Sequence, residues 1–174
     1  MRYSALFFAV ALVGAGLDLL TKSLAFQHIR SGWEEVQIID GFLSYGRTTN
    51  PGVVFGLGSG AKSLWIVISV VAVPAIFAIF YFGRKHKWIP TIALGMIMAG
   101  TIGNMVDRVT MGAVRDFIKF YYRTGAGLEK VWPLFNLADS FICVGVFLLT
   151  VEMLFFEEKR KISRPAGPGP VAAA

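Results

Sequence analysis

Residues 100–140 read GTIGNMVDRVTMGAVRDFIKFYYRTGAGLEKVWPLFNLADS, and they place three aspartates beside segments apolar enough to lie in lipid. The three are Asp107, Asp116 and Asp139. Ionisable side chains at membrane depth are costly, and they usually face the interior of a helix bundle or a water-filled cavity. This stretch therefore predicts a polar functional site in a membrane protein.

Two of the aspartates follow an asparagine by three residues, as Asn104 with Asp107 and Asn136 with Asp139. Residues three apart on a helix lie on the same face. We therefore expect each amide to share a face with its acid, and the two pairs to form facing halves of one polar pocket.

The composition outside this stretch indicates a membrane protein. The chain has 174 residues, of which 55% are hydrophobic and 16% charged. A span needs roughly 20 apolar residues, and four stretches qualify, at about 3–26, 64–82, 88–106 and 134–156. We expect an all-α bundle of four transmembrane helices in a single domain, 1–164. Residues 165–174 form a Pro/Gly/Ala tail without core-forming content.

The net charge of +6 is best explained by membrane topology. Short loops rich in Lys and Arg stay in the cytoplasm. Such clusters lie between the second and third spans and after the fourth, at Arg84, Lys85, Lys87, Lys159, Arg160, Lys161 and Arg164. We expect both termini in the cytoplasm. No basic face with interleaved aromatics indicates nucleic-acid binding.

The segment between the first two spans predicts a small extracytoplasmic sheet. Residues 35–38 alternate like a half-buried strand, Asp40-Gly41 is a turn signal, and residues 42–47 can return as the partner strand. Residues 48–60 contain Pro and four glycines. They are either a flexible connection or a loop whose free amides and Asn50 side chain bind a substrate backbone.

Strand spacing places Asp116 on one face with apolar neighbours, namely Val114, Ile118, Phe120 and Tyr122. Such surroundings raise the pKa of a carboxyl by desolvation. Residues 123–132, which include Thr-Gly-Ala-Gly, are expected to form a surface loop.

Other polar residues near the span ends allow two interpretations each. Asp18 and Lys22 are four apart, so a helix pairs them, or Lys22 extends to the lipid headgroups as an anchor. Arg108 can pair with Asp107 or with a lipid phosphate. Gly95, Gly100 and Gly103 allow close approach of neighbouring helices.

The sequence lacks the residue patterns that several kinds of catalytic or binding site require. The two histidines fall on opposite sides of the membrane, Cys143 is the single cysteine, and no nucleophile elbow or phosphate loop occurs. Carboxylates remain. Two aspartates that share a proton can activate water and protonate a leaving amine, so no cofactor or metal is expected. The alternatives are a small transporter or proton-conducting bundle with Asp18, Asp107 and Asp139 as a relay, and a non-catalytic assembly factor.

Five blocks, in this order, resemble the lipoprotein signal peptidase family, bacterial signal peptidase II. They are DLLTK at 18–22, NPGVVF at 50–55, GTIGNMVDR at 100–108, VRDF at 114–117 and FNLADS at 135–140. The resemblance implies a metal-free aspartic endopeptidase in the bacterial plasma (inner) membrane with its active site at the extracytoplasmic face. It would remove the signal peptide from diacylglyceryl-modified prolipoproteins by cleaving just before the lipidated cysteine.

The resemblance also implies roles for individual residues. Asp116 and Asp139 match the catalytic pair. The positions that hold the substrate, or the cyclic peptide inhibitor globomycin, match Asn50, Gly52, Asn104, Arg108 and Asn136. The supporting polar positions match Asp18, Lys22 and Asp107. Membrane lipid is an expected partner and a monomer the expected state. Val53-Val54 stands where smaller residues are common, which would narrow the substrate pocket.

Overall fold

The computed structural model describes residues 2–29, 35–52, 62–83, 87–124 and 129–156. The elements, in chain order, are α1 (Arg2–His28), β1 (Val36–Ile39), β2 (Leu43–Asn50), α2 (Lys62–Phe82), α3 (Trp88–Met111), β3 (Val114–Arg123), β4 (Glu129–Val131) and α4 (Leu137–Phe156). Three predictions concern residues outside the described ones: the narrowing of the substrate pocket at Val53-Val54, the basic cluster after the fourth span, and the tail at 165–174.

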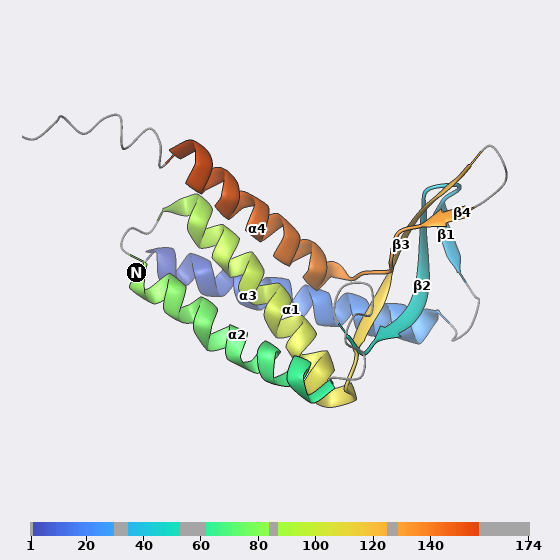
Figure 1. The fold of residues 1–174 in the computed structure, drawn as a ribbon, viewed down its shortest axis with the longest axis horizontal. Helices are drawn as coiled ribbons and strands as arrows, with labels where there is room; N and C mark the ends of the chain where they lie inside the picture. Colours follow the sequence, from blue (N-terminus) through green and yellow to red (C-terminus); the bar gives the residue numbers. More distant parts are fainter. Residues whose placement is uncertain (1, 30–34, 53–61, 84–86, 125–128, 157–174) are drawn as a thin grey trace, which may run out of the picture.

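Each of the four described helices is long and apolar enough to cross a membrane. This confirms the predicted four-helix membrane fold. Helix α3 packs against α1, α2 and α4, so it forms the centre of the bundle (Figure 1). Its mean hydropathy is the lowest of the four, because it carries polar residues into the interior.

The helix ends differ from the expected limits of the spans. Helix α3 continues to Met111 instead of ending near 106, and α4 begins at Leu137 instead of 134. Hydropathy marks where lipid-compatible residues stop, whereas a helix stops where the backbone turns. Here Gly112 turns it, with a φ of 71° and its N–H bonded to the Arg108 carbonyl.

Glycines bring the helices into close contact, as the sequence predicted. A Cβ added at Gly100 would lie 2.3 Å from the Ala138 carbonyl oxygen. One added at Gly103 would lie 2.2 Å from Asp18 Oδ2. Side chains larger than hydrogen at these positions would push α1 and α4 away from α3.

The apolar core lies toward the opposite end of the bundle from the sheet. It is made by Phe7 and Ala11 of α1, Ile76 and Phe80 of α2, and Met98 of α3. The rings of Phe7 and Phe80 stack with centroids 4.1 Å apart. Packed aromatic pairs of this kind fix the helices relative to one another.

The four described strands form an antiparallel sheet in the order β1-β2-β3-β4. The predicted hairpin is confirmed, with Gly41 at a φ of 75° in its turn. The surface loop expected at 123–132 is only partly correct, because β4 pairs with the end of β3 from Tyr121↔Val131 to Arg123↔Glu129. Three residues are too few for a strand to show alternation in the sequence.

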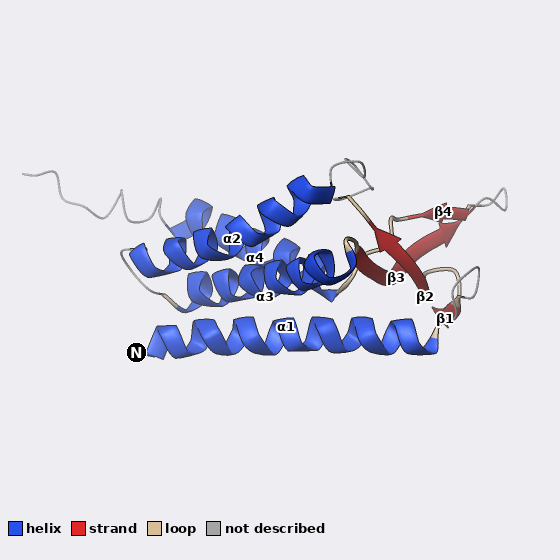
Figure 2. Cartoon of the chain, turned by 90° about the horizontal axis from the view of Figure 1, so that it is seen from below, coloured by secondary structure: helices blue, strands red, loops and turns tan. Residues whose placement is uncertain are grey.

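The sheet lies beyond the end of the bundle where α1 ends (Figure 2), and α4 begins at the same end (Figure 1). The start of α1 and the end of α4 lie together at the other end (Figure 1). A backbone bridge between Ile118 of β3 and Phe135 holds the sheet against the residues that precede α4. The sheet and the polar helix ends therefore meet at one place.

Candidate active site

Asn136 and Asp139 close the start of α4 together. The Asp139 N–H donates to Asn136 Oδ1 at 2.9 Å, and the Asn136 N–H donates to Asp139 Oδ2 at 3.2 Å. This reciprocal pattern is a capping box. The expectation that both residues share a helical face is therefore wrong, because α4 begins only at Leu137. Asp139 lies in the first turn, where the helix dipole favours a negative charge.

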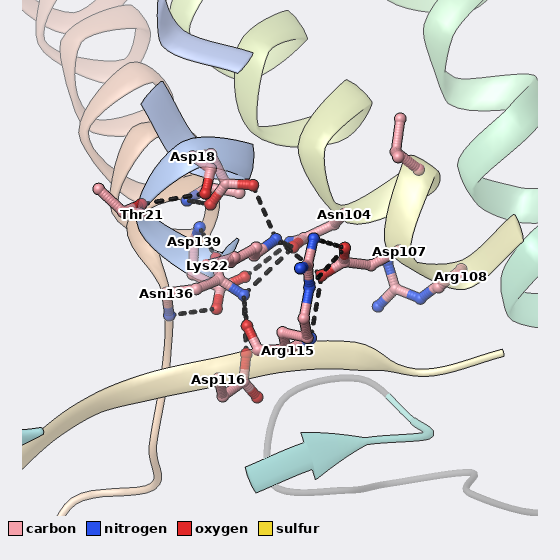
Figure 3. A network of polar contacts seen from close by, with 12 residues as sticks. Asp18, Thr21, Lys22, Asn104, Asp107, Arg108, Arg115, Asp116, Asn136 and Asp139 are labelled. Atoms are coloured by element: carbon pink, nitrogen blue, oxygen red, sulfur yellow. Dashed lines mark hydrogen bonds and ion pairs between the residues drawn. The ribbon is translucent and has the colours of Figure 1, made fainter. Parts of the chain in front are cut away.

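Asp116 lies within β3 and is 2% exposed. Its Oδ1 accepts a hydrogen bond of 2.7 Å from Asn136 Nδ2 (Figure 3). Since the backbone N–H of Asn136 donates to Asp139 Oδ2, one residue contacts both carboxyl groups, Asp116 through its side chain and Asp139 through its backbone. The structure thus brings Asp116 and Asp139 together, and we refer to this pair as the carboxyl dyad.

The surroundings of Asp116 raise its pKa from the ordinary value of 3.8 to about 7. Burial is the main cause, because it disfavours the charged form. The negative charge of Asp139 raises the pKa further, while hydrogen bonds from Asn136 and Asn50 counter the rise. Near neutral pH this carboxyl is therefore able to hold a proton or release it, as acid–base catalysis requires.

Asn104 of α3 connects the dyad to the bundle interior. Its Nδ2 donates to Asp139 Oδ1 at 2.9 Å. Its Oδ1 accepts from Lys22 Nζ at 2.9 Å and from Asn136 Nδ2 at 3.2 Å. The two asparagines of the Asn-x-x-Asp pairs therefore face each other directly (Figure 3).

Behind Asn104 lies a buried ion network. Lys22 Nζ is 2.7 Å from Asp18 Oδ2 and 3.2 Å from Asp107 Oδ2, and all three side chains are fully buried. Arg115 also holds Asp107, with its Nη2 2.7 Å from Oδ1 and its backbone N–H bonded to Oδ2 at 3.0 Å. Asp18 Oδ1 accepts from the Ala138 N–H at 2.8 Å. The interpretation of Lys22 as a headgroup anchor is wrong.

Arg108 has partners other than the expected ones. Its Nη1 donates to Ser69 Oγ of α2 at 3.3 Å, and its Nη2 donates to the Gly52 carbonyl at 3.2 Å. Asn50 Oδ1 accepts from the Gly52 N–H at 3.0 Å, which shapes the chain there into a turn. Asp107, the expected partner, is held by Lys22 and Arg115 instead. The Arg108 guanidinium therefore connects α3 to α2 and to the segment after β2.

The dyad lines a cavity of about 1390 Å³, which exceeds the usual volume of a small-molecule pocket. Polar side chains of the sheet and α3 line it together with apolar side chains of α2 and α4. These include Asn50, Asn104, Arg108, Ile68, Ala72, Ile142 and Val144. Within the part of the chain that the structure describes, no three His, Cys, Asp or Glu side chains are grouped to hold a metal ion.

Sequence reasoning missed two residues of the site, Arg115 and Ser69. Arg115 directly precedes Asp116, and a cation beside a candidate catalytic acid was a usable signal. Its partner, Asp107, could not be inferred, because their contact depends on the turn at Gly112. Ser69 is a buried hydroxyl in an apolar helix, where a polar side chain needs a partner. The sequence therefore indicated that Ser69 has a polar neighbour, but it did not show that this neighbour is Arg108.

Four apolar helices with a cluster of buried polar residues at one end define a multi-pass membrane protein. The sequence also matches the family described as signal peptidase (SPase) II over residues 10–155. The chain belongs to the signal peptidase II family, and it is therefore a peptidase.

Relatives and solved structures support this over nearly the whole chain. A lipoprotein signal peptidase of Geobacter sulfurreducens is 38% identical over 90% of this chain and 95% of its own length. A lipoprotein signal peptidase of Halalkalibacterium halodurans is 34% identical over 92% of this chain and 99% of its own length. A solved bacterial membrane enzyme has a TM-score of 0.78 at 25% identity, covering 92% of this chain and 94% of that chain.

Proposed function

We propose that this chain is an aspartic endopeptidase that removes the signal peptide from diacylglyceryl-modified prolipoproteins, cleaving just before the lipidated cysteine. The observation that carries the proposal is the carboxyl dyad, in which the side-chain amide of Asn136 donates to Asp116, its backbone N–H donates to Asp139, and Asp116 has a pKa near neutrality. The relatives named lipoprotein signal peptidase supply the substrate class.

In the proposed reaction the dyad starts with one proton. The ionised carboxyl takes a proton from water as the water oxygen bonds to the scissile carbonyl carbon. The protonated carboxyl donates a hydrogen bond to the developing oxyanion. When the C–N bond breaks, this carboxyl gives its proton to the leaving nitrogen. The dyad again holds a single proton, because one carboxyl gained a proton and the other lost one.

The other predicted residues have roles around the dyad. Asn50, Gly52, Asn104, Arg108 and Asn136 hold the substrate, and the bond from Arg108 to the Gly52 carbonyl fixes the segment after β2 beside the cavity. The supporting residues are Asp18, Lys22 and Asp107. Globomycin would occupy the same cavity. The protein works as a monomer in the plasma membrane, with both termini in the cytoplasm, so the dyad faces the other side.

The lipid requirement follows from the position of the cavity. Its apolar part runs between α2 and α4, beside residues such as Ile68 and Val144. Acyl chains held at the membrane would fix the modified cysteine beside the dyad, which replaces a search in solution by local positioning. The carboxyls gather at the sheet end of the bundle, so nothing favours a relay across the membrane.

Cleavage of a lipidated prolipoprotein by purified protein in detergent tests the proposal. Asp116→Asn and Asp139→Asn should each abolish turnover while the lipidated substrate still binds. Asp40→Asn is the matched control, since this aspartate lies on the exposed hairpin turn with a side chain 73% exposed. Wild-type rates in either dyad variant would refute the assignment, as would equal cleavage of lipidated and unlipidated substrate.

A further inference from the structure

Lys22 is the residue behind the dyad whose role the proposed reaction leaves open. It is fully buried, and three side-chain oxygens surround its ammonium group, from Asp18, Asp107 and Asn104. The first two oxygens belong to carboxylates, which balance its charge. The third belongs to a neutral amide that does not need a cation. Charge balance therefore does not explain the contact with Asn104.

An ammonium group is a hydrogen-bond donor only, so the atom of Asn104 that faces Lys22 has to be the oxygen. The two ends of a carboxamide have nearly the same shape, and its partners decide which way it points. With Oδ1 held by Lys22 at 2.9 Å, Nδ2 is left to point at Asp139 Oδ1, also at 2.9 Å. Lys22 thus determines that Asp139 meets a donor there.

Asn136 does not fix the amide of Asn104 in this way by itself. Its Nδ2 has three acceptors, Asp116 Oδ1 at 2.7 Å, the Arg115 carbonyl at 3.2 Å and Asn104 Oδ1 at 3.2 Å. The contact to Asn104 is one of the two longest of these and shares a donor with the others. Lys22 is the charged donor in the pair that holds the Asn104 oxygen, and charged donors form the stronger bonds.

We propose that Lys22 is a positioning residue which, by fixing the orientation of the Asn104 amide, makes Asp139 the ionised member of the dyad and leaves Asp116 to carry the proton. The proposal rests on the proposed function and assigns Asp139 as the base and Asp116 as the acid.

The donors around the two acids agree with this assignment. Asp139 accepts from Asn104 Nδ2 and from the Asn136 N–H, at the start of a helix. Asp116 lies in a buried strand position, where desolvation raises its pKa. Burial therefore favours the protonated form of Asp116 on the strand.

A test has to separate this role from simple charge balance. The charged groups that face Asn104 and the dyad are Asp18 and Lys22 of α1, Asp107 and Arg108 of α3, Arg115 and Asp116 of β3, and Asp139 of α4. Removing Lys22 alone leaves an uncompensated buried carboxylate, which destabilises a protein for reasons unrelated to the amide. Removing Asp18 at the same time takes away one charge of each sign.

The double variant Asp18→Asn/Lys22→Met keeps the net charge of the wild type, which is therefore its reference. The single variant Asp18→Asn shows what the loss of Asp18 does while an asparagine oxygen still accepts from the Ala138 N–H and Lys22 still holds Asn104. In the double variant the Asn104 amide is free to turn over. Thermal unfolding in detergent checks that both proteins are folded. The pH profile of kcat and KM is then measured on a lipidated prolipoprotein.

Relative to its reference, the double variant should lose about tenfold in kcat at neutral pH, the effect of one hydrogen bond to a charged group. The acidic limb of its profile should move toward neutral pH by about one unit. Superimposable profiles in the folded double variant and the wild type would overturn the proposal and leave Lys22 a purely structural role.

Asn104→Ala provides a second test that keeps Lys22 in place. If Lys22 acts through Asn104, this variant should move the same limb in the same direction. An unchanged limb would overturn the proposal even if the double variant did not fold. A failure of the proposed function is distinct, because it would appear as absent cleavage by the wild type or as full activity of Asp116→Asn.

Discussion

Replacing Asp116 by asparagine should stabilise the protein at alkaline pH although it abolishes the proposed reaction. The pKa of this carboxyl is about 7 in the folded protein, whereas the ordinary value for an aspartate is 3.8. The difference is about three units, and each is worth about 1.4 kcal/mol, so ionised Asp116 lowers the free energy of unfolding by up to about 4 kcal/mol. Asparagine accepts the same bond from Asn136 without a charge.

The pH dependence gives the effect a signature. Between about pH 4 and pH 7 the unfolded chain releases this proton while the folded protein retains it, so the wild type loses stability as the pH rises. Above about pH 7 both states have lost the proton and the loss is complete. The stability gap between Asp116→Asn and the wild type should therefore widen from pH 4 to pH 7 and then stay constant.

Unfolding in detergent, followed by tryptophan fluorescence at pH 5, 6, 7 and 8, measures this gap. Asp40→Asn serves as the control, and its gap to the wild type should not change with pH. A variant Asp116→Asn that is less stable than the wild type at pH 8 would refute the reasoning. A gap that is the same at every pH would show that burial does not hold the proton on this carboxyl.

Three further predictions follow from the site. The rate of prolipoprotein cleavage should fall as the pH rises through about 7, because the dyad loses its shared proton, and a kcat/KM that still increases at pH 8 would contradict this. Gly103→Ala would set a methyl group 2.2 Å from Asp18 Oδ2 and should cost about 1–3 kcal/mol in unfolding experiments, whereas Gly16→Ala, with nothing within 4 Å, should not destabilise. Ser69→Ala should raise KM several-fold by releasing Arg108, and Ser69→Thr, which keeps the hydroxyl, should retain the wild-type KM.

The sequence predicted well those features that depend on local chemistry. Four apolar stretches of sufficient length indicated four helices. Asp40-Gly41 indicated a hairpin because few other residue pairs accept its backbone angles. Spacing of four placed Lys22 beside Asp18, and the ion pair forms at 2.7 Å. In each case neighbouring residues contain all the information required.

Features that depend on contacts between distant segments were predicted less well. The spacing of Asn136 and Asp139 fits a shared helical face and a capping box equally, and the difference depends on where the helix begins. That point is set by the bridge between Phe135 and Ile118 of a distant strand. The bond between Arg115 and Asp107 likewise requires the left-handed turn at Gly112, which hydropathy does not reveal.

The contacts of α1 also bear on how the protein is assembled during synthesis. Lys22 reaches Asn104, 82 residues later, and Asp18 reaches Ala138, 120 residues later. When the first span enters the bilayer, these two side chains have only each other, and their pairing one helical turn apart lowers the cost of insertion. The polar centre is completed only when the last span arrives, so in the proposed reaction a nascent chain without that span cannot cleave a substrate, because Asp139 is not yet in place.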